Sequence, residues 1–253
     1  MQDVPTLEVD GARATIRFHR AERHNALGAA DIATVVEHLA SVDANANVRV
    51  LVLASTGRTF CAGYDLNALA GEQQGGAAAE AVTFGTMVDR LEHLRVPAVA
   101  ALGGSLYGGG TDLALACDIR IGVPGIQLRM TASRIGVQYY ASGMQRYVAR
   151  VGLGAAKRIF LAAEAVPAEE LLRIGFLDEL VPAGDLMKRV DELAHALATN
   201  APGAVQGMKR SLNAIAAGTA DAAAIDRAFA ASLRSPDVTE GLAAYREKRE
   251  PSF

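Results

Sequence analysis

The stretch LGGSLYGGGTDLALACDIR, residues 102–120, is the part of the chain around which the rest is organised. The apolar run that leads into it, residues 99–102, predicts the end of a buried strand. Glycines follow, and the triplet Gly108 to Gly110 stands just ahead of a helical run at residues 113–117. Strand, glycine turn and helix start can together form a site, because glycine lets a ligand approach the backbone and the first N–H groups of a helix attract an anion.

Asp112 lies within the first turn of that predicted helix. A carboxylate is electrostatically favoured there, and it could also reach a bound ligand. On these residues alone, a tight turn with a helix-capping aspartate explains the pattern equally well.

Length and composition predict one large domain, or one domain with an appendage, in a soluble protein. The chain has 253 residues, and its 25 basic residues nearly balance 28 acidic ones. This balance offers no basic face for nucleic acid, and no apolar run approaches the ~20 residues of a membrane span. The two cysteines, Cys61 and Cys117, are too few for a disulfide framework and, like the five histidines, lack metal-ligand spacing. The first residues do not resemble a signal peptide, so we expect a cytoplasmic protein without a metal.

Hydrophobic periodicity predicts an α/β chain followed by a helical tail. Alternation at residues 14–18 and a β-branched run at 48–53 predict strands, whereas one apolar face predicts a helix over 29–42. The other expected elements are a loop at 70–80, a helix at 82–94, a strand at 118–123 and a short strand near 180–181. We therefore divide the chain into a core of residues 1–192 and an alanine-rich helical segment of residues 193–253.

Three motifs, in this order and across nearly the whole chain, resemble those of the crotonase (enoyl-CoA hydratase/isomerase) superfamily. They are FCAGYDL at residues 60–66, GGGTD at 108–112, and GMQR at 143–146 with Gly152 behind it. The resemblance implies a spiral of ββα turns with a helical C-terminal trimerisation segment. It also implies that the partners are an acyl-CoA thioester, processed through an enolate, and further copies of the chain in a homotrimer or a dimer of trimers.

In this superfamily two backbone N–H groups hold the thioester oxygen, and the resemblance assigns them to Tyr64 and Gly109. Preorganised donors are most effective where charge develops, and losing one typically costs ~3 kcal/mol. Coenzyme A enters as part of the substrate, so no separate cofactor is expected.

The resemblance also carries over the contacts with coenzyme A. They are Arg23, Ala26, Ala62, Leu66, Phe229, Tyr245 and Lys248, the last from a neighbouring subunit. For the two aromatic residues the alternative is ordinary helix packing, and for the two cations it is a solvated charge.

Two positions depart from the pattern of a hydratase with two catalytic glutamates. Asp112 stands at the first position as the shorter acid, and Ala132 stands at the second. Alanine transfers no proton, and one general acid or base typically contributes ~10²–10⁴-fold to the rate. Ordinary hydration should therefore be impaired.

The segments 104–109, 130–131 and 135–139 are also similar to the methylmalonyl-CoA decarboxylase branch, which has a tyrosine at the position of Tyr139. A neutral phenol can orient a substrate carboxylate, whereas Asp112 would repel one. The catalytic candidates are therefore Asp112 and Tyr139, and hydration, isomerisation and decarboxylation stay open. A non-catalytic scaffold that binds CoA esters stays open too, whereas the balanced charge disfavours RNA binding.

Overall fold

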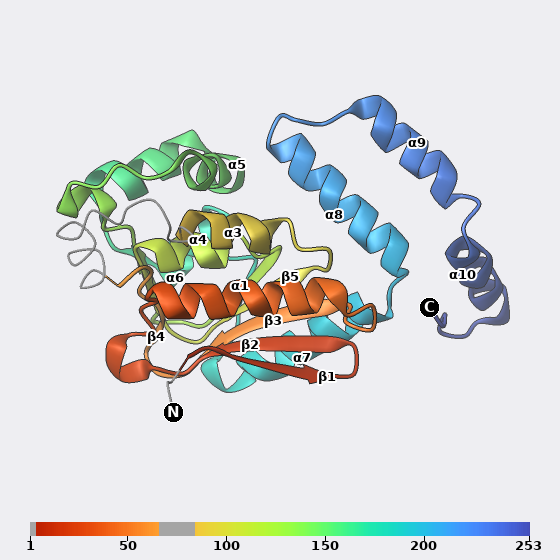
Figure 1. Ribbon diagram of the computed structural model, residues 1–253, viewed down its shortest axis with the longest axis horizontal. Coiled ribbons are helices and arrows are strands. Elements are labelled where there is room, and N and C mark those ends of the chain that lie inside the picture. Colours follow the sequence, from red (N-terminus) through yellow and green to blue (C-terminus); the bar gives the residue numbers. More distant parts are fainter. Residues whose placement is uncertain (1–3, 66–83) are drawn as a thin grey trace.

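The computed structural model describes residues 4–65 and 84–253. A six-stranded sheet with the order β1-β2-β3-β5-β7-β10 runs through its middle (Figure 1). The strands are β1 (Thr6–Asp10), β2 (Arg13–Phe18), β3 (Val50–Ser55), β5 (Ala98–Leu102), β7 (Ile119–Gly122) and β10 (Glu179–Leu180). β1 and β2 pair in antiparallel fashion and the other neighbours in parallel. Every strand predicted from the sequence lies in this sheet, with ends displaced by a residue or two.

A second sheet has the order β4-β6-β8-β9. Its strands are β4 (Thr59–Cys61), β6 (Ser105–Tyr107), β8 (Gln127–Arg129) and β9 (Val166–Pro167). They were not predicted, because strands of two or three residues show too little alternation to be recognised. The chain passes from β3 to β4, from β5 to β6 and from β7 to β8, and a helix follows each pair. These repeated ββα turns confirm the expected spiral.

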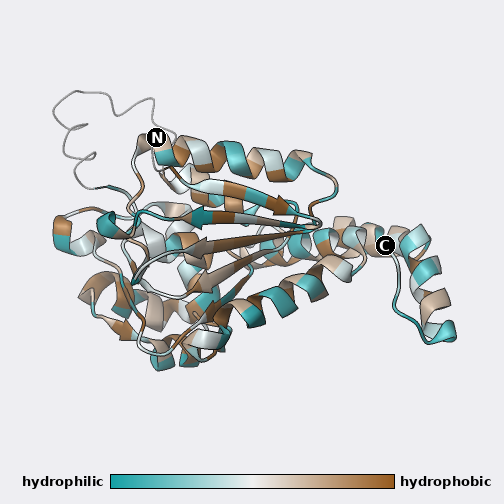
Figure 2. Ribbon diagram, turned by 90° about the horizontal axis from the view of Figure 1, so that it is seen from below, coloured by the Kyte–Doolittle hydropathy of each residue, from teal (hydrophilic) through white to brown (hydrophobic). Residues whose placement is uncertain are grey.

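Helices cover the large sheet on both sides, which explains why β5 is apolar throughout and β3 is apolar up to its last residue, Ser55. Figure 1 shows α1 (Ala29–Ala44) and α3 (Phe84–Glu92) above the strands and α7 (Leu186–Thr199) below them. The remaining core helices are α4 (Gly109–Leu115), α5 (Ala141–Lys157) and α6 (Ala168–Arg173). Colouring by hydropathy places the apolar strands between helices whose outer faces are polar (Figure 2).

Three C-terminal helices follow this core; the first lies beside it, joined through Lys209 and Asn213, and the other two extend away from it, as both ribbon views show. They are α8 (Pro202–Ala216), α9 (Ala222–Ser232) and α10 (Pro236–Glu247). The division we expected at residue 192 falls inside α7, whose Val190 and Ala194 are buried in the core. The loop expected at residues 70–80 lies outside the described residues. Within the described ranges, no helix combines the length and hydrophobicity that a membrane span requires.

The contact between α4 and β4 leaves no room for a side chain at Gly110. A Cβ there would lie 2.1 Å from the carbonyl oxygen of Cys61 and 2.6 Å from its carbonyl carbon. Because these are backbone atoms, Gly110→Ala is expected to lower the free energy of unfolding by ~1–3 kcal/mol. Urea denaturation followed by circular dichroism measures the difference.

Gly154 provides a matched control in α5. It is exposed, it is not among the glycines with positive φ, and a Cβ on it would have no atom within 4 Å. Gly154→Ala should be neutral or stabilising by up to ~1 kcal/mol, since alanine favours the helix. An equal loss of stability in both variants would contradict the proposed clash.

Candidate active site

The end of β4 and the start of α4 approach each other so closely that only glycine fits. A Cβ on Gly63 would lie 2.4 Å from the amide nitrogen of Gly109, and Gly63 has a φ of 84°. Gly109 is the first residue of α4, so its N–H has no acceptor within the helix. The peptide that joins Gly63 to Tyr64 and the amide of Gly109 are therefore neighbours.

Backbone hydrogen bonds from the preceding loop hold this peptide in place. The Leu27 N–H donates to the Gly63 carbonyl at 2.8 Å, and the Leu27 carbonyl accepts from the Asp65 N–H at 2.9 Å. Leu27 and Tyr64 thereby form a parallel bridge. The backbone around Tyr64 is fixed by main-chain contacts, which leaves its half-buried side chain available to shape the site.

Asp112 lies in α4 and is fully buried, with an exposed fraction of 0%. The Nε of Arg146 donates to its Oδ1 at 2.9 Å, and the hydroxyl of Tyr140 donates to its Oδ2. The hydroxyl of Tyr139 donates in turn to that of Tyr140 at 3.3 Å, and the two rings stack with centroids 4.3 Å apart. The structure therefore brings the two catalytic candidates, Asp112 and Tyr139, together through Tyr140.

Sequence reasoning assigned no chemical role to Arg146 or to Tyr140. Gly143, Arg146 and Tyr147 are buried on one face of α5. An arginine on the buried face of an amphipathic helix requires a partner, and this spacing is the signal that could have identified it. Gly143 makes room for the cluster, since a Cβ there would lie 2.5 Å from a ring carbon of Tyr139 and 2.8 Å from Asp112 Oδ2.

Burial and charge keep these groups in defined protonation states. Burial raises the pKa of Tyr139 and of Tyr140, and the nearby Asp112 carboxylate raises both further, so both phenols are neutral donors. Burial alone would lower the pKa of Arg146, but the Asp112 carboxylate and then Glu92 raise it more. The net shift is upward, and the guanidinium stays charged.

Two other residues of the site contribute no acid or base. Ala132, where the resemblance predicts that a second acid is missing, is 8% exposed and opens the short 3₁₀ helix Ala132–Ile135. Burial raises the pKa of the Cys61 thiol to about 12, so it stays protonated. Within residues 4–65 and 84–253, no three His, Cys, Asp or Glu side chains gather as a metal site.

The expected coenzyme A contacts fall into two separate groups. Arg23 donates to the Asp65 carboxylate at 3.0 Å, and Ala62 donates its N–H to the His24 carbonyl at 3.0 Å, which places both beside Tyr64. Ala26 lies in the same loop, where Arg20 donates to its carbonyl at 2.9 Å. Leu66 lies outside the described residues.

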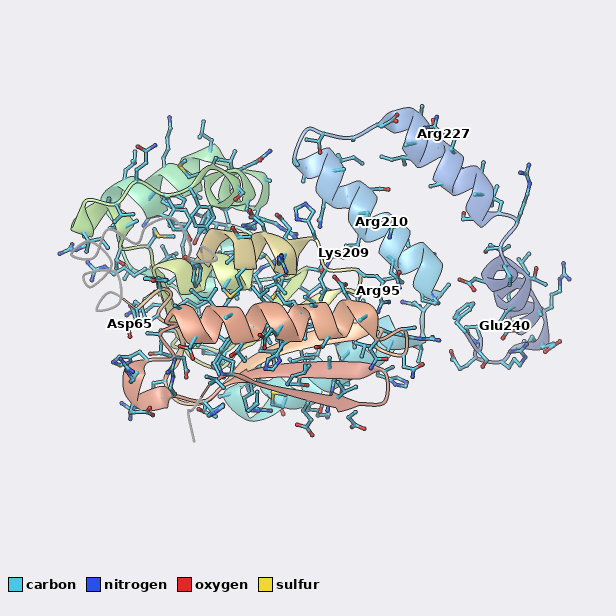
Figure 3. The ribbon with its side chains drawn as sticks, in the orientation of Figure 1. Asp65, Arg95, Lys209, Arg210, Arg227 and Glu240 are labelled. Carbon is cyan, nitrogen blue, oxygen red and sulfur yellow. The ribbon has the colours of Figure 1, made fainter. Side chains whose placement is uncertain are left out.

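The second group lies on the C-terminal helices. Phe229 in α9 is 64% exposed, Tyr245 in α10 is 83% exposed, and Lys248 directly follows α10. Figure 3 labels Asp65 at the opposite end of the molecule from Arg227 in α9 and Glu240 in α10. Within one chain, the structure does not bring this group to Tyr64 and Gly109.

The buried phenols predict a loss of stability at high pH. The unfolded chain ionises its tyrosines near their ordinary pKa of ~10, whereas burial raises the pKa of Tyr139, Tyr140 and Tyr147 in the folded chain. Their contribution is therefore complete below about pH 10 and is lost as the pH rises from there toward the folded-state pKa. Urea unfolding between about pH 8 and pH 11 measures this decline.

Tyr140→Phe removes one of these phenols and should make the decline shallower. Tyr140→Phe also loses the hydrogen bond to Asp112, which lowers the free energy of unfolding at every pH. The comparison therefore uses the slope of the free energy of unfolding against pH, in the variant and in the parent. If the free energy of unfolding falls equally steeply above about pH 10 in the variant and in the parent, the loss of stability does not come from the buried phenol of Tyr140.

The comparisons with known proteins agree with this geometry. Residues 8–253 match the family described as enoyl-CoA hydratase/isomerase. The short-chain-enoyl-CoA hydratase of Clostridium acetobutylicum is 29% identical over 96% of this chain and 95% of its own. The 2,3-dehydroadipyl-CoA hydratase of Escherichia coli is 28% identical over 94% of this chain and 93% of its own. The crystal structure of an enoyl-CoA hydratase from Bacillus anthracis covers 100% of this chain and 99% of that chain, with 30% identity and a TM-score of 0.90. The chain therefore belongs to the enoyl-CoA hydratase/isomerase family of the crotonase superfamily.

Proposed function

We propose that this acyl-CoA-processing protein holds the thioester oxygen between the N–H groups of Tyr64 and Gly109 and stabilises an enolate there. The observation that carries the proposal is the close approach of Gly63 to the Gly109 amide. A thioester carbonyl gains negative charge as it becomes an enolate, and two fixed donors lower the free energy of that state most. The two hydratases named above are both named for enoyl-CoA substrates, which supports a substrate of this class.

Asp112 is the group that we propose exchanges a proton with the substrate. Arg146 donates to both of its oxygens and Tyr140 donates to Oδ2. A carboxylate has about four acceptor directions, so one remains on Oδ1. One acid is enough to move a proton at the α carbon of a thioester. Activation of water for hydration gains from a second, and Ala132 supplies none, so crotonyl-CoA hydration should be slow.

A second candidate, decarboxylation, is favoured by the hydroxyl of Tyr139. This neutral hydroxyl donates its one proton to Tyr140, which donates to Asp112, so it would have to turn away from Tyr140 to orient a substrate carboxylate. The repulsion expected from Asp112 is reduced because Arg146 pairs with it. Loss of carbon dioxide leaves the same enolate, so the Tyr64 and Gly109 amides would serve both reactions.

For coenzyme A we propose contacts with Arg23, Ala26, Ala62 and Leu66 of one chain and with Phe229, Tyr245 and Lys248 of its neighbour. The two groups of residues lie at opposite ends of one chain, as Figure 3 indicates, so a complete site needs a second copy. The large apolar side chains exposed on the C-terminal helices support a homotrimer or a dimer of trimers; they include Met208, Leu212, Ile215, Leu233 and Leu242. The free, buried thiols Cys61 and Cys117 suit the reducing cytoplasm that we propose as its compartment.

A panel of acyl-CoA thioesters that includes crotonyl-CoA and methylmalonyl-CoA tests the function. Mass spectrometry detects the gain of water or the loss of carbon dioxide. If Asp112 transfers the proton, Asp112→Ala should reduce kcat by ~10²-fold or more with little change in substrate binding. Ala132→Glu should then raise crotonyl-CoA hydration above the parent.

The same panel separates the two candidates. If Tyr139 orients a carboxylate, Tyr139→Phe should depress the decarboxylation of methylmalonyl-CoA more than Asp112→Ala does. Unimpaired activity in both variants would exclude both residues from the mechanism. A parent that binds every thioester and converts none would instead support the scaffold.

Subunit mixing tests whether the site is shared. Sedimentation at micromolar concentration should give a trimer or a hexamer, and a monomer would contradict the proposal. Lys248→Ala should raise KM, and Asp112→Ala should lower kcat. When the two variants are refolded together, activity should reappear, because some sites combine Asp112 of one chain with Lys248 of another. If the mixed assemblies recover no activity, each site takes both residues from the same chain.

A further inference from the structure

Arg146 binds three carboxylates at once. Its Nε donates to Asp112 Oδ1 at 2.9 Å, its Nη2 donates to Asp89 Oδ1 at 3.1 Å, and its Nη1 donates to Glu92. Asp112 belongs to α4, whereas Asp89 and Glu92 belong to α3. Arg146 is only 4% exposed, so carboxylates from two helices share one buried positive charge.

We propose that Arg146 is a positioning residue that holds Asp112 in its ionised form, and that Glu92 limits this effect from α3. The inference rests on the proposed function, in which Asp112 exchanges a proton with the substrate. Arg146 binds both oxygens of Asp112, Oδ1 through Nε at 2.9 Å and Oδ2 through Nη2 at 3.4 Å, while Tyr140 also donates to Oδ2. Glu92 draws on the same guanidinium and thereby weakens its hold on Asp112.

The exposed fractions of the side chains explain why Asp112 depends most on Arg146. The side chain of Asp112 is 0% exposed, whereas those of Glu92 and Asp89 are 25% and 39% exposed. The two α3 carboxylates border a cavity of about 480 Å³ between α3, α5 and α8, and Arg146 forms part of its wall. Water in that cavity can solvate Glu92 and Asp89. Asp112 has no such solvent, and a buried carboxylate without a partner takes up a proton.

The other charged and titratable groups around this cluster are partly paired among themselves. Those that face Asp112 or share the cavity with Arg146 are Tyr139, Tyr140 and Tyr147, His93 just after α3, Arg150 on α5, and Asp118 with Lys209. Lys209 reaches from α8 toward the core (Figure 3) and binds Asp118 at 2.7 Å, so these two charges offset each other. Glu92 is therefore the α3 carboxylate whose neutralisation tests the competition most directly, since it directly contacts the guanidinium and is less exposed than Asp89.

The experiment follows the exchange of the α protons of butyryl-CoA for solvent deuterium, by mass spectrometry, as a function of pH. This exchange needs an enolate and one base that also trades its proton with solvent, and the buried Asp112 has the hydroxyls of Tyr140 and Tyr139 beside it for that step. If Asp112 must be ionised, the rate falls at low pH, and the position of this acid limb reports how well the carboxylate is stabilised. Arg146→Gln should move the limb to higher pH by ~1–3 units, and Arg146→Lys, which keeps a charge and loses the Nε donor, should move it less in the same direction.

Glu92→Gln should move the limb the opposite way, to lower pH by roughly half a unit, because Arg146 then serves Asp112 with less competition. If the Arg146–Glu92 ion pair had only a structural role, the acid limb would not shift in opposite directions. Arg146→Gln and Glu92→Gln would then both lower the melting temperature, and neither would move the limb. The control is Glu164→Gln, which neutralises a surface partner of Arg158 that is 52% exposed and should leave the limb in place.

The outcomes separate this inference from the proposed function. If the parent binds butyryl-CoA and exchanges no proton, the proposed role of Asp112 fails. If the parent exchanges and Asp112→Asn does not, but the limbs of Arg146→Lys and Glu92→Gln coincide with that of the parent, only the positioning role is overturned. If Arg146→Gln does not fold, Arg146→Lys and Glu92→Gln still give opposite shifts when the inference is correct and coincident limbs when it is wrong.

Discussion

The contact on which the rest of this structure depends is the one between the end of β4 and the first turn of α4. Gly110 lies against the carbonyl of Cys61, and Gly63 lies against the amide of Gly109, at distances that exclude a Cβ at either position. Close packing of two backbones brings N–H groups from different ββα turns together, so that no side chain is needed as a donor. The same contact fixes α4, and with it the position of Asp112. The contact between β4 and α4 therefore determines the positions of both the proposed oxyanion donors and the proposed acid.

A second constraint comes from charge. Asp112 has no access to water, and a buried carboxylate is retained in its ionised form only beside a cation or several donors. Arg146 and Tyr140 supply these, and Gly143 leaves the space in which they meet. The guanidinium also contacts Asp89 and Glu92, so its charge is divided between the site and α3. The site is therefore linked through Arg146 to a helix that contributes no proposed catalytic group.

The third constraint is geometric separation. Asp65, which directly follows Tyr64, lies at one end of the molecule, while Phe229 and Tyr245 stand exposed on α9 and α10 at the other end. An aromatic side chain has a less favourable free energy in water than in an interface, where its large apolar surface is buried. If a neighbouring copy covers Phe229 and Tyr245, as we propose, the same association that buries the apolar helices also completes the contacts with coenzyme A. Assembly and substrate binding would then be one equilibrium.

The sequence by itself determined much of this protein. Long apolar or alternating runs predicted strands of the large sheet. The glycine motifs at residues 60–66 and 108–112 identified the superfamily, and with it the candidate residues Tyr64, Gly109 and Asp112. Such signals are local, since periodicity and glycine requirements act over a few residues. The short strands of the second sheet and the pairing of Asp112 with Arg146, Tyr140 and Glu92 were decided by the tertiary structure alone. A strand of three residues has no period to recognise, and the strength of a charge–charge contact depends on distance and burial, which are set only when α3, α4 and α5 pack together.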